Sequence, residues 1–303
     1  MGSSPCRGPA TPARPEDAGG SVRGPGVRLF RARQGRWPGA DRSHVAGMTE
    51  VPAGAVLRVI DLETTGQGFA DGGVVEVGWQ DLARDAGGAW SLRGGPGARL
   101  VRPEHPISAQ TSAIHHIVDE DVAGAGSWGE VAPEVLQPVP APLALVAHRA
   151  SFEQRWCRPQ WSGGARWICT YKCALRLWPD SPTHSNQGLR YARRPEGLDR
   201  ETGLPAHRAG PDAYVTAFHV RDMLAVADVA QLLAWSDEPA LLVKVPFGPW
   251  RGRRWAELGE DALEQILAGG AGSNVDMAFT ARTERARRDG VVAEPPVQSA
   301  LGL

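Results

Sequence analysis

The sequence of 303 residues has almost no lysine, few cysteines, no long apolar run and almost no net charge. Lys172 and Lys244 are its two lysines, so arginine supplies nearly all of the 33 basic residues, which stand against 34 acidic ones. Because the formal charge is −1, the field of the whole protein cannot attract a polyanion. A nucleic-acid partner would have to be held by a local basic patch.

The scarcity of cysteine and of apolar runs argues against two classes of protein, disulfide-stabilised scaffolds and membrane or exported proteins. The four cysteines form no C-x-x-C pair and no regular framework, which argues against a disulfide scaffold and favours a reduced, cytoplasmic protein. No window reaches the ~18 consecutive apolar residues of a membrane span, and the N-terminus lacks the apolar core of an export signal. We therefore expect a cytoplasmic protein without a membrane partner.

Composition divides the chain into four parts. Residues 1–47 are rich in Gly, Pro and Arg and have no apolar periodicity, which predicts a disordered extension. Met48 directly follows this extension and precedes the first predicted strand, which raises the hypothesis that translation begins there. Residues 48–227 have the length of one domain, 228–268 form a small C-terminal module, and 269–303 carry few apolar residues and are expected to be a flexible tail.

Strand and helix patterns alternate within the main domain and predict an α/β fold, a mixed sheet covered by helices. Strands are expected at 56–60, 74–79, 98–102 and 143–147, and helices at 108–118, 130–136, 151–158, 170–178 and 211–226. In the small module we expect a strand at 240–245 and a helix at 255–267.

A pair of carboxylates stands directly after the first predicted strand. Asp61 and Glu63 are two positions apart, and in an extended chain such positions share a face. Two carboxylates within ~4 Å repel by about 4 kcal/mol at an effective dielectric of ~20, so the pair implies a cation or a raised pKa. Mg²⁺ or Mn²⁺ suits such hard oxygen ligands. Read alone, the pair also fits a solvated turn with a capping aspartate.

Two further segments place an acid in the first turn of a predicted helix. Glu153 follows a short apolar strand and comes directly after Phe152, whereas Asp212 lies five residues after His207. Each segment has an ordinary interpretation, because the helix dipole favours an acid near a helix N-terminus. Neither segment by itself distinguishes a functional site from helix capping.

Together the three segments resemble the DEDDh class of proofreading-type 3′→5′ exonucleases, and within that class the exodeoxyribonuclease X family. The resemblance covers roughly residues 56–226 and implies a ribonuclease-H-like fold, with a mixed five-stranded sheet flanked by helices. Six flanking segments also carry it: Arg102-Pro103, Pro106-Ile107-Ser108, Ala113-Ile114-His115, Trp167-Ile168-Cys169-Thr170, Leu175-Arg176-Leu177-Trp178-Pro179 and His207-Arg208-Ala209.

The resemblance further implies catalysis with two ions, Mg²⁺ or Mn²⁺. Asp61 would bridge both ions, Glu63 and Asp212 would complete the tightly held one, and Glu153 would act on the second, largely through water. His207 would take a proton from the attacking water. The expected substrate is DNA with a free 3′ end, single-stranded or frayed, and the expected product is a nucleoside 5′-monophosphate.

The second segment departs from the family pattern, which has Asn and Asp where this chain has Arg149 and Glu153. A water-mediated ligand tolerates the extra methylene of Glu153, whereas a direct ligand would displace its ion. Arg149 either binds phosphate or pairs with Glu153, and the pairing would leave a catalytically weakened nucleic-acid-binding module. An RNA-directed exonuclease of the same fold is another alternative, because no residue reports on the 2′-hydroxyl. The sequence does not indicate an oligomeric state.

A set of substrate-binding residues follows from the same resemblance. Three small residues after the carboxylate pair would line the pocket for the 3′-terminal nucleotide, since small side chains let backbone amides approach phosphate or sugar oxygens. A histidine further along would contact the terminal base or sugar, although a core histidine is an equally open interpretation. The whole predicted set is Thr64, Thr65, Gly66, His115, Arg149 and Phe152.

The segment 244–255 mixes cations, aromatics and glycine. This composition suits a surface on which arginines hold phosphates and rings stack on bases. It also resembles an F-G-K-Y-R-G-K element of the family, with Pro249 and Trp250 in place of the Lys and Tyr. We expect contact with DNA here, and the alternative is that Phe247 and Trp255 form the core of the small module.

Overall fold

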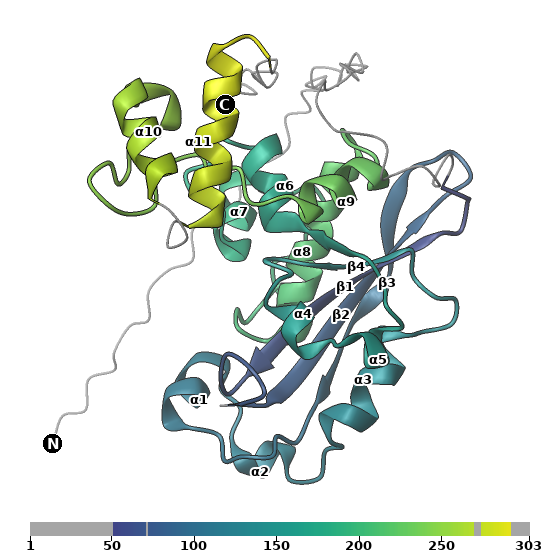
Figure 1. Cartoon of the computed structure of the whole chain (residues 1–303). Coiled ribbons are helices and arrows are strands. Elements are labelled where there is room, and N and C mark those ends of the chain that lie inside the picture. Colours follow the sequence, from purple (N-terminus) through teal and green to yellow (C-terminus); the bar gives the residue numbers. More distant parts are fainter. Residues whose placement is uncertain (1–50, 71, 270–273, 292–303) are drawn as a thin grey trace, which may run out of the picture. The chain divides into compact units, whose positions relative to one another are not determined.

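Five β-rich segments pair into one mixed sheet in the computed structural model, which describes residues 51–70, 72–269 and 274–291 (Figure 1). The strand order is β3-β2-β1-β4-β5, with β1 antiparallel to β2, β2 antiparallel to β3, and β4 parallel to both β1 and β5. This ribonuclease-H-like arrangement confirms the predicted fold class. The strands are β1 (Val56–Thr64), β2 (Val74–Arg84), β3 (Trp90–Leu100), β4 (Ala144–Ala147) and β5 (Trp167–Cys169).

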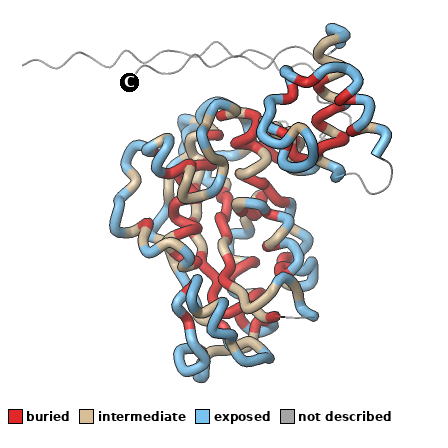
Figure 2. Tube along the Cα trace, turned by 90° about the vertical axis from the view of Figure 1, so that its left-hand side faces the viewer, coloured by how far each residue is buried: buried red, intermediate tan, exposed pale blue. Residues whose placement is uncertain are grey.

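The period of two along β1 gives the sheet two apolar faces. Leu57 and Val59 belong to one core cluster, whereas Ile60 and Leu62 belong to another. Buried segments fill the space between the layers, and exposed segments lie outside (Figure 2). The first cluster is covered by α6 (Thr170–Leu177), α7 (Asn186–Arg193), α8 (Ala209–Leu224) and α9 (Val229–Asp237), and the second by α3 (Trp128–Leu136), α4 (Glu153–Trp156) and α5 (Pro159–Ser162).

Shorter elements complete the fold. Of the helices that the structure describes, none is both long and apolar enough to cross a membrane. The helix predicted at 108–118 ends early, because His116 adopts a left-handed conformation with φ 59°. The remaining elements are α1 (Ala109–His115), α2 (Asp119–Val122), the 3₁₀ helix η2 (Trp255–Glu257), α10 (Glu260–Ala268) and α11 (Val275–Arg288).

Two predictions for the C-terminal module were wrong in detail. No strand forms over 240–245 among the described residues, where Lys244 and Arg254 make an isolated bridge. The single helix predicted at 255–267 is divided into η2 and α10, because Leu258 takes an extended conformation with ψ 141° between them. The prediction failed because the apolar spacing continues through this break.

The expected tail over 269–303 contains an ordered helix. Asn274 caps α11 by accepting hydrogen bonds from the backbone N–H groups of Asp276 and Met277. Met277 and Ala281 lie four residues apart and pack against α10. They belong to a third core cluster, which is formed by residues of the C-terminal module. Few apolar residues thus suffice, because a neighbouring helix supplies the rest of the core. The predicted extension 1–47 and residues 292–303 lie outside the described ranges.

The main domain extends past the predicted boundary at 228. Leu232, Leu233 and Trp235 of α9 belong to the same core cluster as the sheet residues. The separate C-terminal core begins later, around Val245 and Trp255. Helix α9 therefore closes the sheet domain.

Candidate active site

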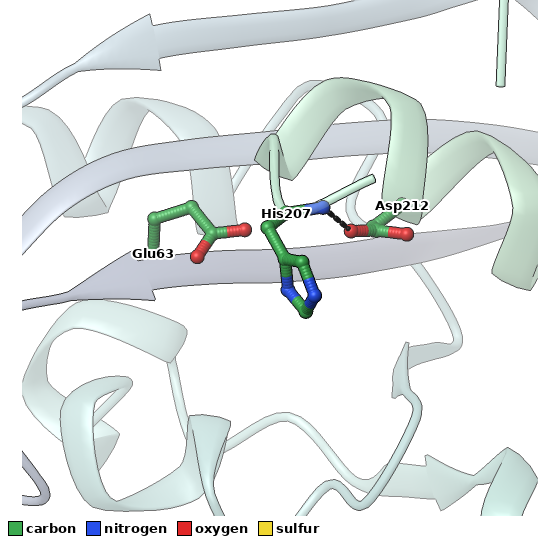
Figure 3. A group of neighbouring side chains, drawn as sticks. All are labelled: Glu63, His207 and Asp212. Carbon is green, nitrogen blue, oxygen red and sulfur yellow. Dashed lines mark hydrogen bonds between the residues drawn. The ribbon is translucent and has the colours of Figure 1, made fainter. Parts of the chain in front are cut away.

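Three side chains from distant parts of the sequence meet beside the end of β1. One ligand atom each of Glu63, His207 and Asp212 lies within 4.8 Å of the others (Figure 3). Glu63 is the penultimate residue of β1, Asp212 lies in the first turn of α8, and His207 precedes that helix by two residues. Both carboxylates are buried and the imidazole is exposed. The predicted partners therefore do share one site.

Hydrogen bonds fix both oxygens of Asp212. Its Oδ2 accepts from the backbone N–H of His207 at 2.7 Å, and its Oδ1 accepts from Gln187 Nε2 at 2.6 Å. Asn186 Nδ2 adds a longer bond to Oδ1 at 3.3 Å. Arg190 Nη1 in turn donates to Gln187 Oε1 at 3.2 Å and so orients that amide. The carboxylate is held in one orientation, and Oδ2, which accepts a single hydrogen bond, keeps a lone pair for a ligand.

A bidentate ion pair holds the turn that carries His207. Arg208 donates to Glu76 through Nε at 2.9 Å and Nη2 at 2.6 Å, and the backbone N–H of Ala209 donates to Glu76 Oε2 at 2.9 Å. Gly78 lets this turn approach β2, since a Cβ there would lie 2.0 Å from the Ala209 carbonyl carbon. The start of α8 is thereby pinned to the sheet, which sets the place of His207.

Asp61 and Glu153 lie near this group but outside its 4.8 Å limit among the residues that the structure describes. Burial, then the carboxylates of Asp212, Glu63 and Glu153, hold the pKa of Asp61 well above its usual range. Glu153 is buried, and its Oε2 has no hydrogen-bond partner in the described chain. The four predicted carboxylates therefore influence one another, although they are not equally supported.

The carboxylate cluster lacks enough neighbouring positive charge to neutralise it, which the raised pKa values of its members indicate. Burial, with the carboxylates of Asp212 and Glu76, raises the pKa of Glu63 to about 8. Burial, with the carboxylate of Glu63, raises the pKa of Glu153 to about 8 as well. Burial also raises the pKa of Asp212, against the hydrogen bonds from Gln187 and His207. Such a cluster favours either shared protons or bound cations.

A pocket of about 210 Å³ opens beside Glu63. Among the predicted substrate-binding residues, Thr65 does not line it, because its hydroxyl accepts from the backbone N–H of Gly73 at 2.9 Å and closes the loop after β1. Arg149 also lies outside the lining. The residues that line the pocket are Leu62, Glu63, Thr64, Gly66, Gln67, Thr111, Ile114, His115 and Phe152.

His115 offers an unused donor to this pocket. The ring is 1% exposed, and its Nδ1 accepts from the backbone N–H of Ile117 at 3.1 Å. Burial lowers the pKa of His115, which favours the neutral ring with its proton on Nε2. Nε2 has no hydrogen-bond partner in the described part of the chain. The ring is thus half satisfied by the protein, and its Nε2 is buried beside the pocket without a partner in the described chain.

Arg149 does not neutralise Glu153. Its guanidinium lies over the ring of Tyr171, with 3.8 Å from Cζ to the ring centroid, and within the described ranges it forms no ion pair with Glu153. Arg149 adopts a left-handed conformation with φ 70° and is exposed. Of the two roles left open by the sequence, the structure excludes the pairing.

The basic segment 244–255 divides its aromatic residues between core and surface. Trp255 is buried and Trp250 packs against the same core, whereas Phe247 is 51% exposed. Arg254 pairs with Asp180 at 3.0 Å, and Arg253 donates to the backbone oxygen of Glu257. Stacking on DNA, which stays a prediction, is therefore left to Phe247.

Sequence reasoning missed the residues that support the site. Glu76 had a readable signal, because a charged residue within the apolar run 74–79 must be paired when the strand is buried. Asn186 and Gln187 had none, since polar residues at the start of a helix are common on any surface. Their role depends on the packing of α7 against α8.

Comparison with known proteins places the chain in a family. No family model matches the sequence. Two curated relatives, the exodeoxyribonuclease 10 proteins of Escherichia coli strain K12 and of Escherichia coli O6:H1, are each 35% identical over 210 residues, which is 68% of this chain and 86% of the relative. A solved structure of exonuclease X in complex with 5′ overhanging duplex DNA is 36% identical, covers 59% of this chain and 97% of that one, and has a TM-score of 0.47. The identity and coverage of the curated relatives show that the chain belongs to the exodeoxyribonuclease 10 (exonuclease X) family.

Proposed function

We propose that this protein is a metal-dependent 3′→5′ exonuclease that hydrolyses the terminal phosphodiester of DNA and releases nucleoside 5′-monophosphates. The observation that carries the proposal is the convergence of Glu63, Asp212 and His207 beside a pocket. The names of the two relatives, both exodeoxyribonucleases, support DNA as the substrate.

The donor set fits divalent cations. It consists of carboxylate oxygens, which Mg²⁺ and Mn²⁺ prefer. Burial raises the pKa of each carboxyl, and repulsion between carboxylates adds to this for Asp61 and Glu63. We propose that Asp61, Glu63 and Asp212 would hold two such ions and that Glu153 would act on them through water. Bound ions of this kind lower the pKa of an attacking water and neutralise charge on the attacking and leaving oxygens.

His207 accepts the proton of the attacking water in this proposal. An imidazole suits the task because its unperturbed pKa lies near neutrality. Its backbone N–H is tied to Asp212, so the ring is placed by the same carboxylate that holds an ion. The ring is exposed, which lets it pass the proton to solvent.

The pocket residues orient the terminal nucleotide. Thr64 and Gly66 line the pocket at the end of β1, and His115 Nε2–H is available to donate to a base or sugar acceptor. Phe152 supplies an apolar part of the pocket lining. Together they hold the 3′ nucleotide next to the carboxylates, which is positioning rather than chemistry.

The experiment compares 3′-labelled and 5′-labelled DNA strands with Mg²⁺, with Mn²⁺ and with EDTA. Immediate release of labelled mononucleotide from the 3′ label, and a ladder from the 5′ label, is the expected result. Release only from the 5′ label would show the opposite polarity, and no release in any metal would indicate a silent binding module. A matched RNA strand assigns the preferred sugar.

A His207→Ala variant assigns the proton acceptor. We expect turnover near background with an unchanged melting temperature. Wild-type turnover in this variant would remove His207 from the reaction.

A further inference from the structure

The segment from Arg149 to Arg176 is unusually one-sided in charge. Glu153 is its single acidic residue and is buried. Three of its cations are tied to helix α9 and its end: Arg166 pairs with Asp237, and Lys172 and Arg176 bond the backbone or side chain of Glu238. The other three, Arg149, Arg155 and Arg158, are exposed, and we call them the arginine row.

Each guanidinium of the arginine row lies over an aromatic ring. The distances from Cζ to the ring centroid are 3.8 Å for Arg149 over Tyr171, 5.9 Å for Arg155 over Phe152 and 4.0 Å for Arg158 over Phe69. No carboxylate pairs with any of the three within the described ranges. Stacking on a ring restricts a long side chain and leaves its N–H edges free, so less entropy is lost when an anion binds.

Two members of the row, Arg155 and Arg158, are connected to the pocket by contacts with its loop. Arg155 Nη1 donates to the backbone oxygen of Gln67 at 3.1 Å, and both Gln67 and Phe152 line the pocket. Phe69, under Arg158, lies in the same loop and packs against Trp156 with ring centroids 4.7 Å apart. This loop and helix α4 thus connect the row to the pocket wall through direct contacts.

We infer that the arginine row binds the phosphates of the DNA strand that continues from the 3′-terminal nucleotide in the pocket. The inference rests on the proposed function for the direction of the strand. A chain with a formal charge of −1 needs a local patch of this kind to hold a polyanion. The planar, weakly hydrated guanidinium groups also offer surfaces on which unpaired bases stack.

The test is the salt dependence of DNA binding. We would measure fluorescence anisotropy of a labelled 12-nucleotide single strand in Ca²⁺, over a range of salt, for wild type and for the triple variant Arg149→Gln, Arg155→Gln, Arg158→Gln. Each phosphate contact contributes a slope of about 0.7 in log K against log salt for single strands, so loss of three contacts should reduce the slope by about 2.

Two controls keep the inference falsifiable. Arg166→Gln removes an exposed arginine that already pairs with Asp237, and it should leave the slope unchanged. The triple Arg→Lys variant keeps the charges and should retain most of the slope, even if loss of ring stacking lowers stability. An unchanged slope in the triple Gln variant, or an equal loss in Arg166→Gln, would overturn the inference.

Nucleotide release by wild type in Mg²⁺ is scored separately. Binding with a slope that depends on the row, but without release, overturns the proposed function and leaves the row as a DNA-binding surface. Release together with an unaffected slope overturns the row alone.

Discussion

The two sides of the carboxylate cluster are built differently. On one side Asp212 accepts hydrogen bonds from His207, Gln187 and Asn186, which fix both of its oxygens. On the other side Glu153 is buried with one oxygen that accepts no hydrogen bond from a described group, and burial raises its pKa to about 8. We expect Asp212 to hold an ion in one fixed position. We expect the side chain of Glu153, which lacks such hydrogen bonds at Oε2, to change its conformation and its protonation more easily.

We relate this difference to the second of the three resembling segments, in which Arg149 and Glu153 replace the Asn and Asp of the family pattern. A glutamate in place of aspartate adds one methylene, which would misplace a carboxylate fixed by three hydrogen bonds. At Glu153 no such bonds to Oε2 exist, and Arg149 is directed toward Tyr171 rather than toward the acid. We propose that the departure at Arg149 and Glu153 is tolerated because it falls on this side of the site.

The largest effect should come from changing the fixed side by one methylene. We expect Asp212→Glu to lower turnover about a thousand-fold, the rate equivalent of about 4 kcal/mol, because the longer side chain cannot keep its three hydrogen bonds and its ligand position together. Steady-state release of mononucleotides measures it. Asp261→Asn, an exposed acid of α10, is the control and should be silent. Activity within ten-fold of wild type would show that the fixed side is no more demanding than the other.

The next largest effect should come from removing a hydrogen bond that orients Asp212. Gln187→Ala removes the 2.6 Å bond to Asp212 without touching a proposed ligand. Loss of such a supporting bond typically costs about 10- to 100-fold in metal affinity. We therefore expect the half-saturating Mn²⁺ concentration to rise by about that factor, with a smaller change in turnover at saturating metal. Gln160→Ala, an exposed glutamine of α5, serves as the matched control. An unaltered metal dependence would reduce Gln187 to a packing role.

The same one-methylene change on the adjustable side should matter much less. Glu153→Asp is expected to change turnover by less than about ten-fold, because Glu153 Oε2 gives up no hydrogen bond within the described chain. The assay is the one used for Asp212→Glu, run in parallel. A thousand-fold loss here would mean that Glu153 is held as rigidly as Asp212, and the contrast between the two sides would fail.

The smallest effect concerns pH and the metal-free protein. Glu153 has a pKa of about 8 in the folded state against an ordinary value of 4.5, so the folded state holds its proton more tightly. That contribution to stability is complete below about pH 4.5 and is lost as the pH rises through about 8. In EDTA the melting temperature should therefore fall over this range, by a few degrees for each ~1 kcal/mol lost.

Two comparisons complete the pH experiment. Glu153→Gln should flatten the fall, because an amide does not titrate. Added Mn²⁺ should raise the melting temperature more at pH 8.5 than at pH 6, since metal binds the deprotonated carboxylates. A melting temperature in EDTA that rises between pH 5 and pH 8 would show the opposite sign and contradict the raised pKa.

Prediction from sequence succeeded where the signal is local. The strands at 56–60 and 74–79 could be read from their apolar runs, and Glu153 and Asp212 from their places in the first turns of α4 and α8. Strand β1 itself continues to Thr64, so Asp61 and Glu63 lie within it rather than after it. It failed for α11, whose few apolar residues pack against α10, and for α9, whose apolar residues pack against the sheet beyond the predicted domain boundary. It also failed for the strand expected at 240–245, since no second strand is available there to pair with it.

From the sequence alone it was possible to predict the groups that could do chemistry and the strand and helix ends that carry them. These groups are the carboxylates of Asp61, Glu63 and Asp212 and the imidazole of His207. The hydrogen bonds that hold those groups in place could be known only from the tertiary structure. Gln187 meets Asp212 across 25 residues of sequence, and Arg208 meets Glu76 across 132. The orientation of a side chain depends on such contacts, which no local pattern encodes, so the identity of the site could be read early and its unequal support could not.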